Sequence, residues 1–84
     1  MTHEIKLHET FAEAVLNGDK TFEVRFNDRG YRIGDYVKFI VLSDLNNEIL
    51  DHPLNNNKYI ITYLLSGWGI KDGYVIFSIK KVEE

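Results

Sequence analysis

A lysine, a glutamate and an arginine lie close together in residues 18–25, which read G-D-K-T-F-E-V-R. Lys20 follows a glycine-containing turn, and Glu23 and Arg25 alternate with apolar residues along a predicted strand. Alternation places Glu23 and Arg25 next to each other on one side of that strand. An ammonium, a carboxylate and a guanidinium that converge in this way can hold a polar, planar or anionic ligand. The same spacing also fits a Glu23–Arg25 ion pair on a solvated face.

Four further residues could extend such a site. Asn27 and Arg29 follow in an N-D-R turn and offer an amide for base edges and a guanidinium for phosphate. Trp68 stands between two glycines in the segment 66–73, and Lys71 comes three residues later. An exposed tryptophan can stack on a nucleic-acid base, a contact worth about 1–3 kcal/mol. A tryptophan that folds inward would instead complete a thin core, and the sequence leaves both alternatives open.

Several catalytic patterns are missing from the sequence. His3 and His8 occur as H-E-x-x-x-H, one residue too long for a zincin motif, and they face opposite sides of a predicted strand. No serine has a G-x-S-x-G context, and the chain contains no phosphate-loop motif and no cysteine. We therefore expect no metal and no cofactor. Catalytic residues are expected only if the protein is an enzyme, in which case they are Lys20 and Glu23.

The charge balance limits the kinds of partner. The 84 residues carry a net charge of −3, which argues against indiscriminate binding to nucleic acid. Residues 20–38 carry five basic and three acidic side chains, so anion binding is expected to be local and selective. The absence of cysteine, of a signal-peptide pattern and of any apolar run of about 20 residues predicts a cytoplasmic protein without membrane contact.

The elements that position these residues can be predicted from their periodicity. Residues 4–8 alternate between polar and apolar, which is typical of a half-buried strand. Thr10 and Glu13 form a T-x-x-E sequence, which predicts a capping box at the start of a helix of about two turns. The helix is expected to end at the Asn-Gly pair of residues 17–18. It is expected to bury three apolar residues: Phe11, Ala14 and Val15.

Four more strands are predicted, at residues 21–26, 36–42, 58–65 and 74–82, with a long loop over residues 44–57. In the first of these strands, Phe22, Val24 and Phe26 are expected to face the core and the charged residues the opposite side. Four strands after one helix are too many for a parallel α/β sheet. We therefore expect one mostly β (α+β) domain over residues 1–84, a small antiparallel sheet curled into a partial barrel with the short helix covering one end.

The joint order of these motifs resembles the ASCH (activating-signal-cointegrator homology) domain of the PUA-like superfamily, and within it a subfamily of small bacterial and phage proteins. The matching segments are V-L-x-G at 15–18, K-T-F-E-x-R at 20–25, N-D-R at 27–29, G-D at 34–35 and G-Y-V-x-x-S-I at 73–79. The resemblance implies a β-barrel with an RNA-binding cleft between barrel and helix, lined by the G-x-K-x-x-E-x-R residues. One ASCH branch is an amidohydrolase for acetylated cytidine that uses a threonine three residues after its lysine. Here Glu23 occupies that position, which counts against this activity.

Three functions remain open at this point. The first is an RNA- or nucleotide-binding module that acts without catalysis. Its expected ligand-binding residues are Lys20, Glu23, Arg25, Asn27, Arg29, Trp68 and Lys71. The second is a small amidohydrolase for modified nucleosides, with Lys20 and Glu23 at its centre. The third is a protein-interaction domain whose cleft is empty and whose Glu23–Arg25 pair is structural.

Overall fold

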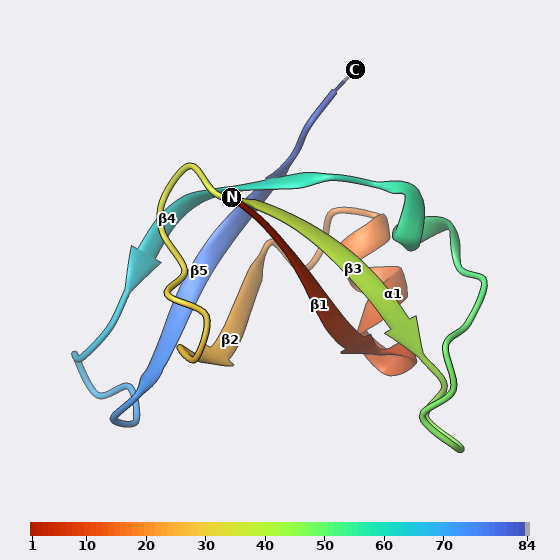
Figure 1. The fold of residues 1–84 in the computed structure, drawn as a ribbon, viewed down its shortest axis with the longest axis horizontal. Helices are drawn as coiled ribbons and strands as arrows, with labels where there is room; N and C mark the ends of the chain where they lie inside the picture. The colour runs from red at the N-terminus through yellow and green to blue at the C-terminus, as the bar shows by residue number, and fades with distance from the viewer. Residues whose placement is uncertain (84) are drawn as a thin grey trace.

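The computed structural model describes residues 1–83 as one curled sheet with a short helix beside it (Figure 1). The elements follow one another as β1 (Thr2–His8), α1 (Glu9–Leu16), β2 (Phe22–Phe26), β3 (Tyr36–Leu42), the 3-10 helix η1 (Pro53–Asn56), β4 (Tyr59–Leu65) and β5 (Tyr74–Lys81). This arrangement confirms the predicted mostly β fold with one short helix after the first strand.

The five strands form a single sheet in the order β1-β3-β4-β5-β2, so β1 and β2 are its two edges. The pairs β3–β4, β4–β5 and β5–β2 are antiparallel, as expected. The pair β1–β3 is parallel, with Thr2 opposite Tyr36 and His8 opposite Leu42. A parallel pair needs a long connection that brings the chain back to the end at which the first strand starts. Here that connection contains α1 and β2. The sheet curves into a half-barrel whose two edges lie across from each other (Figure 1).

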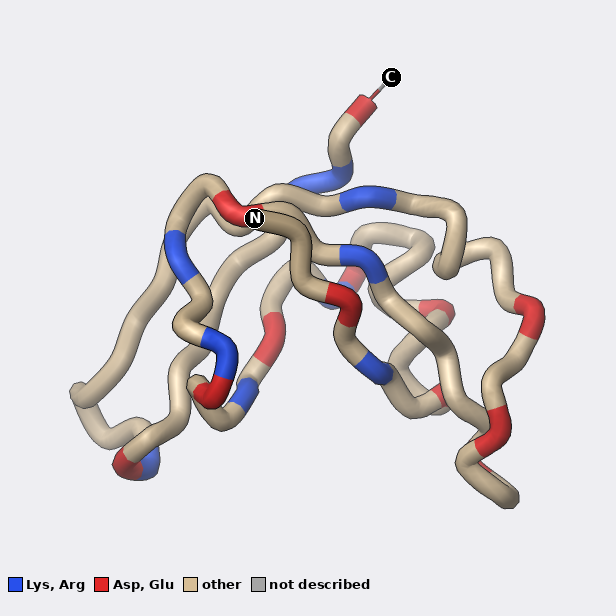
Figure 2. The backbone as a smooth tube through the Cα atoms, in the orientation of Figure 1, with Lys and Arg blue, Asp and Glu red and all other residues tan. Residues whose placement is uncertain are grey.

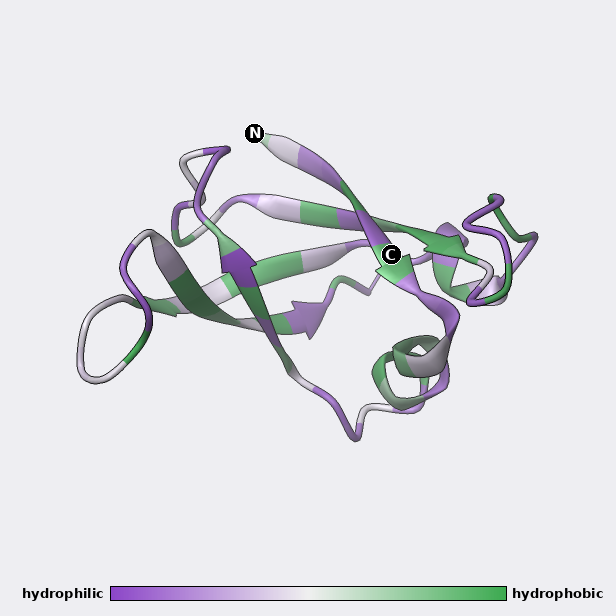
Figure 3. Cartoon of the chain, turned by 90° about the horizontal axis from the view of Figure 1, so that it is seen from below, coloured by the Kyte–Doolittle hydropathy of each residue, from purple (hydrophilic) through white to green (hydrophobic). Residues whose placement is uncertain are grey.

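The core is built from every second residue of β1, β3 and β5. Figure 3 shows the hydrophobic (green) stretches of the strands and of the helix that surround it. Phe39 and Phe77 are the largest of its fully buried side chains. The long segment between β3 and β4 also contributes, because Leu54 of η1 is fully buried. What was expected to be a plain loop therefore carries a residue of the core.

The helix differs from its prediction in phase. It begins at Glu9, directly after β1, with His8 at the N-cap and no side-chain capping bond, so the predicted capping box at Thr10 is wrong. Because the strand leads straight into the helix, no turn is left in which Thr10 could cap. The helix buries Ala12 and Val15, which are three residues apart and lie on one face. Phe11 lies beside that face and is 45% exposed, contrary to its predicted place in the core.

Strand β2 is turned over relative to its prediction. Glu23 is only 2% exposed, whereas Phe22, Val24 and Phe26 are 46%, 52% and 55% exposed. A period of two shows which side chains share a face, but it does not show which face points inward. On this edge strand the inward face carries a carboxylate with two cationic partners, and the outward face is apolar. The expectation that the apolar residues of this strand face the core is therefore wrong.

A buried histidine stabilises the turn that precedes β3. His3 is 4% exposed, and its Nε2 lies 2.8 Å from Oδ2 of Asp35. The same oxygen accepts a hydrogen bond from the backbone N–H of Arg32. The hydrogen bond with His3 is the main reason why the pKa of Asp35 lies below its usual value, against the opposing effect of burial.

This lowered pKa makes a prediction for acid stability. Because the pKa of Asp35 is lower in the folded than in the unfolded chain, the carboxylate stabilises the fold above the unfolded value of about 3.9. That contribution disappears as the pH falls through the folded value. We expect Asp35→Asn to lower the free energy of unfolding in urea at about pH 6, and the difference from wild type to shrink below about pH 4. A difference that stays constant across this range would contradict the assignment.

Candidate functional site

The half-barrel is closed by side chains rather than by a backbone ladder. Between the edge strands β1 and β2, Nη2 of Arg25 donates to the carbonyl oxygen of Lys6 at 2.8 Å. Nη1 of Arg29 donates to the carbonyl oxygen of Glu4 at 2.7 Å. We call this junction of β1 and β2, bridged by Arg25 and Arg29, the seam. Two arginines that lie in the basic part of the sequence thus satisfy backbone acceptors of an otherwise open sheet edge.

The seam contains a buried carboxylate held by two cations. Oε1 of Glu23 accepts from both Nε and Nη2 of Arg25, at 3.0 and 2.8 Å. Oε2 of Glu23 accepts from Nζ of Lys20, which also donates to the carbonyl oxygen of Phe22 at 2.7 Å. Two positive charges face one negative charge, so the group has a net charge of +1. The glycine turn at the end of α1 delivers the lysine, and β2 supplies the other two side chains.

An open cavity of about 580 Å³ lies over this ionic group, between the end of β1, the start of α1 and β2; we call it the seam pocket. Lys20, Glu23 and Arg25 all line it, so the structure brings together the three residues on which the sequence analysis depends. Phe11 and Phe22 line it as well and are each close to half exposed. Nζ of Lys20 lies 5.6 Å from the ring centre of Phe11 and 5.0 Å from that of Phe22.

The two phenyl rings are functional candidates that the sequence analysis assigned to the core. Hydrophobic periodicity gives no sign that Phe11 or Phe22 is exposed, because an apolar residue at a periodic position is expected to be buried. The property that identifies them is their position in space, because each ring lies beside the ammonium group of Lys20. An ammonium within about 6 Å of an aromatic ring centre is a favourable contact.

A smaller cavity of about 280 Å³ lies on the other side of Arg25 and is also lined by Arg29 and Tyr31. Burial raises the pKa of Tyr31, against the opposing effect of the nearby Arg29 and Arg25 guanidinium groups. Asn27 lines neither this cavity nor the seam pocket. Its side-chain oxygen accepts the backbone N–H of Tyr31 at 2.9 Å, and its own N–H donates to the carbonyl oxygen of Gly73. Asn27 therefore shapes the turn after β2.

Trp68 and Lys71 lie in the turn between β4 and β5, outside the seam pocket. Trp68 is 91% exposed, so it does not fold into the core. Its backbone is left-handed, with φ of 53°, a conformation that residues other than glycine adopt rarely. Nζ of Lys71 lies 5.6 Å from the ring centre of Tyr74. The structure thus separates these two predicted site residues from Lys20, Glu23 and Arg25.

Within residues 1–83, no group of three or more histidine, cysteine, aspartate or glutamate side chains could hold a metal ion. In the same residues, no helix has the length and apolar character that crossing a membrane requires.

Comparison with known proteins identifies a family. Residues 2–79 match the model of a family described as a domain of unknown function, DUF3850. No curated protein matches the chain. The matched segment includes both edge strands of the seam and all residues of the ionic group. The chain therefore belongs to the DUF3850 family.

Proposed function

We propose that the protein is an RNA- or nucleotide-binding module and that its ligand occupies the seam pocket. The observation that carries the proposal is that a net positive ionic group and two half-exposed phenyl rings line the same open cavity. A nucleotide offers an anionic phosphate to the ionic group and a planar base to the phenyl rings. The resemblance to the ASCH domain supports the same proposal. The absence of cysteine fits a protein of the reducing cytoplasm.

The hydrogen-bond donors of the ionic group are only partly used. Three of the five N–H groups of the Arg25 guanidinium are engaged, through Nε and Nη2, which leaves the two on Nη1 for a ligand. Lys20 uses its ammonium toward Glu23 and the Phe22 carbonyl and keeps one further proton. Both oxygens of Glu23 already accept hydrogen bonds. In this proposal Glu23 positions the two cations instead of contacting a base edge.

The proposal is tested with Arg25→Lys, which keeps a positive charge beside Glu23 but removes the Nη1 donors. We expect this variant to bind nucleoside monophosphates about tenfold more weakly, since one charge-assisted hydrogen bond is worth about 1.5 kcal/mol or more. Amide chemical shifts in a low-salt NMR titration measure the affinity. Trp68 fluorescence is not a suitable probe because that side chain lies outside the seam pocket.

The matched control is Arg32→Lys, because Arg32 is exposed and lies outside the seam pocket. Its affinity for nucleotides should equal that of the wild type. Wild-type protein whose seam amides do not respond to any nucleotide would contradict the proposed function. Equal losses of nucleotide affinity in Arg25→Lys and Arg32→Lys would show that the binding does not depend on the seam.

A second candidate function is the hydrolysis of modified nucleosides of the acetylated-cytidine type. The observation in its favour is the Lys20–Glu23 pair at the floor of an open cavity. No serine, threonine or tyrosine is among the described residues that line the seam pocket, and Thr21 lines a different cavity. Release of acetate from acetylated cytidine that is lost in Lys20→Ala would favour hydrolysis over binding alone.

A further inference from the structure

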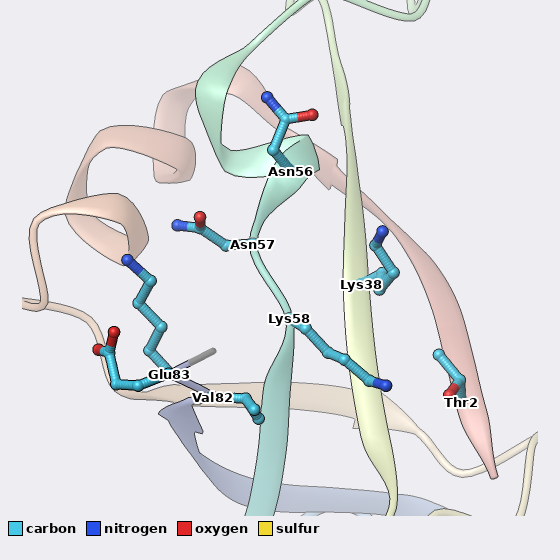
Figure 4. Close-up of a pocket in the computed structure, with 8 residues that line it drawn as sticks. Thr2, Lys38, Asn56, Asn57, Lys58, Val82 and Glu83 are labelled. Carbon is cyan, nitrogen blue, oxygen red and sulfur yellow. The ribbon is translucent and has the colours of Figure 1, made fainter.

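Three lysines gather at the end of the half-barrel that lies near the last described residues. Lys38 of β3, Lys58 just before β4 and Lys81 at the end of β5 line one cavity of about 550 Å³, which we call the lysine pocket. Figure 4 shows Lys38 and Lys58 around this cavity together with Asn56 and Asn57, whose side-chain amides can also donate hydrogen bonds. Figure 2 shows several blue segments, each a lysine or an arginine, near one another in the upper part of the molecule, where β3, the start of β4 and the end of β5 come together.

The three lysines have no acidic partner in the part of the chain that the structure describes. Within residues 1–83, none of them takes part in an ion pair. Nζ of Lys58 instead lies 4.2 Å from the ring centre of Tyr36. Glu83 is the single acidic residue among those described that line the lysine pocket. Three positive charges around one hollow raise the local concentration of anions.

A third cavity shares one lining residue with the lysine pocket and one with the seam pocket. It measures about 270 Å³ and lies between the end of α1 and the end of β5. It shares Lys20 with the seam pocket and Lys81 with the lysine pocket, so the three cavities follow one another along the surface. The smaller cavity at Arg29 continues the series on the other side, because it shares Lys6 and Arg25 with the seam pocket.

The charge of this series of cavities is opposite to that of the whole chain. Eight basic and three acidic side chains line the four cavities, an excess of five positive charges. The complete chain has ten basic and thirteen acidic residues. The basic residues are therefore concentrated along one path, and the acidic residues lie mainly elsewhere. Phe11 and Phe22 stand on this path, at the seam pocket.

From this arrangement we infer that the connected cavities bind an extended single strand of nucleic acid, with a base at Phe11 and Phe22 and its backbone running over Lys20 and Lys81 to the lysine pocket. The inference rests on the proposed function, because the seam pocket supplies the site for the base. Among polyanions, nucleic acid combines regularly spaced phosphates with planar rings, and a single strand leaves those rings accessible. Grooves of small β-barrels bind about 4–16 nucleotides, so a strand of about eight is a suitable probe.

The experiment compares two variants with equal loss of charge. Lys58→Gln/Lys81→Gln removes two cations from the lysine pocket, and the control Arg32→Gln/Lys71→Gln removes two from outside the connected cavities. Affinity for an oligouridylate of about eight nucleotides is measured by fluorescence anisotropy over a salt series, and affinity for uridine monophosphate by NMR. Each phosphate contact to a single strand contributes about 0.7 to the slope of log K against log salt.

We expect the lysine-pocket variant to reduce that slope by about 1.4 for the oligonucleotide and to leave the affinity for uridine monophosphate unchanged. The control should keep the wild-type slope. If the wild type binds the monophosphate but the lysine-pocket variant keeps the wild-type slope, the proposed course of the strand to the lysine pocket is overturned. Binding of a nucleotide in the seam pocket is not contradicted by that result. An equal loss in the control would also overturn it. If the wild type does not bind the monophosphate, the proposed function fails first. Inorganic polyphosphate that binds as tightly as the oligonucleotide would overturn the assignment to nucleic acid.

Discussion

Replacing Glu23 by alanine is expected to lower the free energy of unfolding by about 3 kcal/mol, because loss of one partner from a buried ionic group leaves the others uncompensated. Lys20 and Arg25 are both largely buried at this site and would face each other without the carboxylate between them. A domain of this size has a total stability of about 4–13 kcal/mol, so the loss is a large fraction. Urea unfolding monitored by circular dichroism measures it.

Two further variants separate charge compensation from simple packing. The triple replacement Lys20→Met/Glu23→Leu/Arg25→Met removes all three charges together and is expected to recover most of the lost stability, as apolar replacements of buried ionic groups often do. Glu13→Ala serves as the surface control, because Glu13 is exposed and its only described ion pair is with His52. It should change the stability by less than about 1 kcal/mol. A loss below that value for Glu23→Ala would contradict the interpretation of the network.

The second large effect is expected on binding. Phe11→Ala/Phe22→Ala should weaken the binding of nucleoside monophosphates by about tenfold to 100-fold, since the stacking of one base on aromatic side chains is worth about 1–3 kcal/mol. Both rings are close to half exposed, so their removal should affect binding more than folding. Isothermal titration calorimetry measures the affinity, and thermal unfolding confirms that the variant is folded.

The matched control for this pair is Tyr63→Ala/Trp68→Ala, which removes two exposed aromatic residues outside the seam pocket. It should leave the affinity for monophosphates unchanged. If the control loses the binding and the seam variant keeps it, the stacking platform lies at Tyr63 and Trp68, which is one of the two alternatives that the sequence leaves open for Trp68.

The local part of the site could be predicted from sequence. Lys20, Glu23 and Arg25 lie within six residues, and one turn followed by one strand is enough to bring them together. The direction in which they point could not be predicted in the same way. Alternation along β2 groups Glu23 with Arg25, but only the register with β5, in which Glu23 lies opposite the buried Phe77, shows that this face turns inward.

The long-range parts of the site depend on strand order, which periodicity does not contain. Arg29 reaches the carbonyl oxygen of Glu4, 25 residues away, because β1 and β2 are the two edges of one curled sheet. The lysine pocket likewise joins residues 38, 58 and 81 through the neighbouring positions of β3, β4 and β5. The exposure of Phe11 follows from the orientation of the helix, which buries the face that carries Ala12 and Val15.

The closure of the half-barrel by Arg25 and Arg29 also affects how readily β1 and β2 separate. Rotations of a few side-chain torsions are enough to undo these contacts, whereas unzipping a paired strand disrupts a cooperative unit. The junction of β1 and β2 is therefore expected to open more readily than a junction of two hydrogen-bonded strands, and the width of the seam pocket depends on the conformation of two arginine side chains.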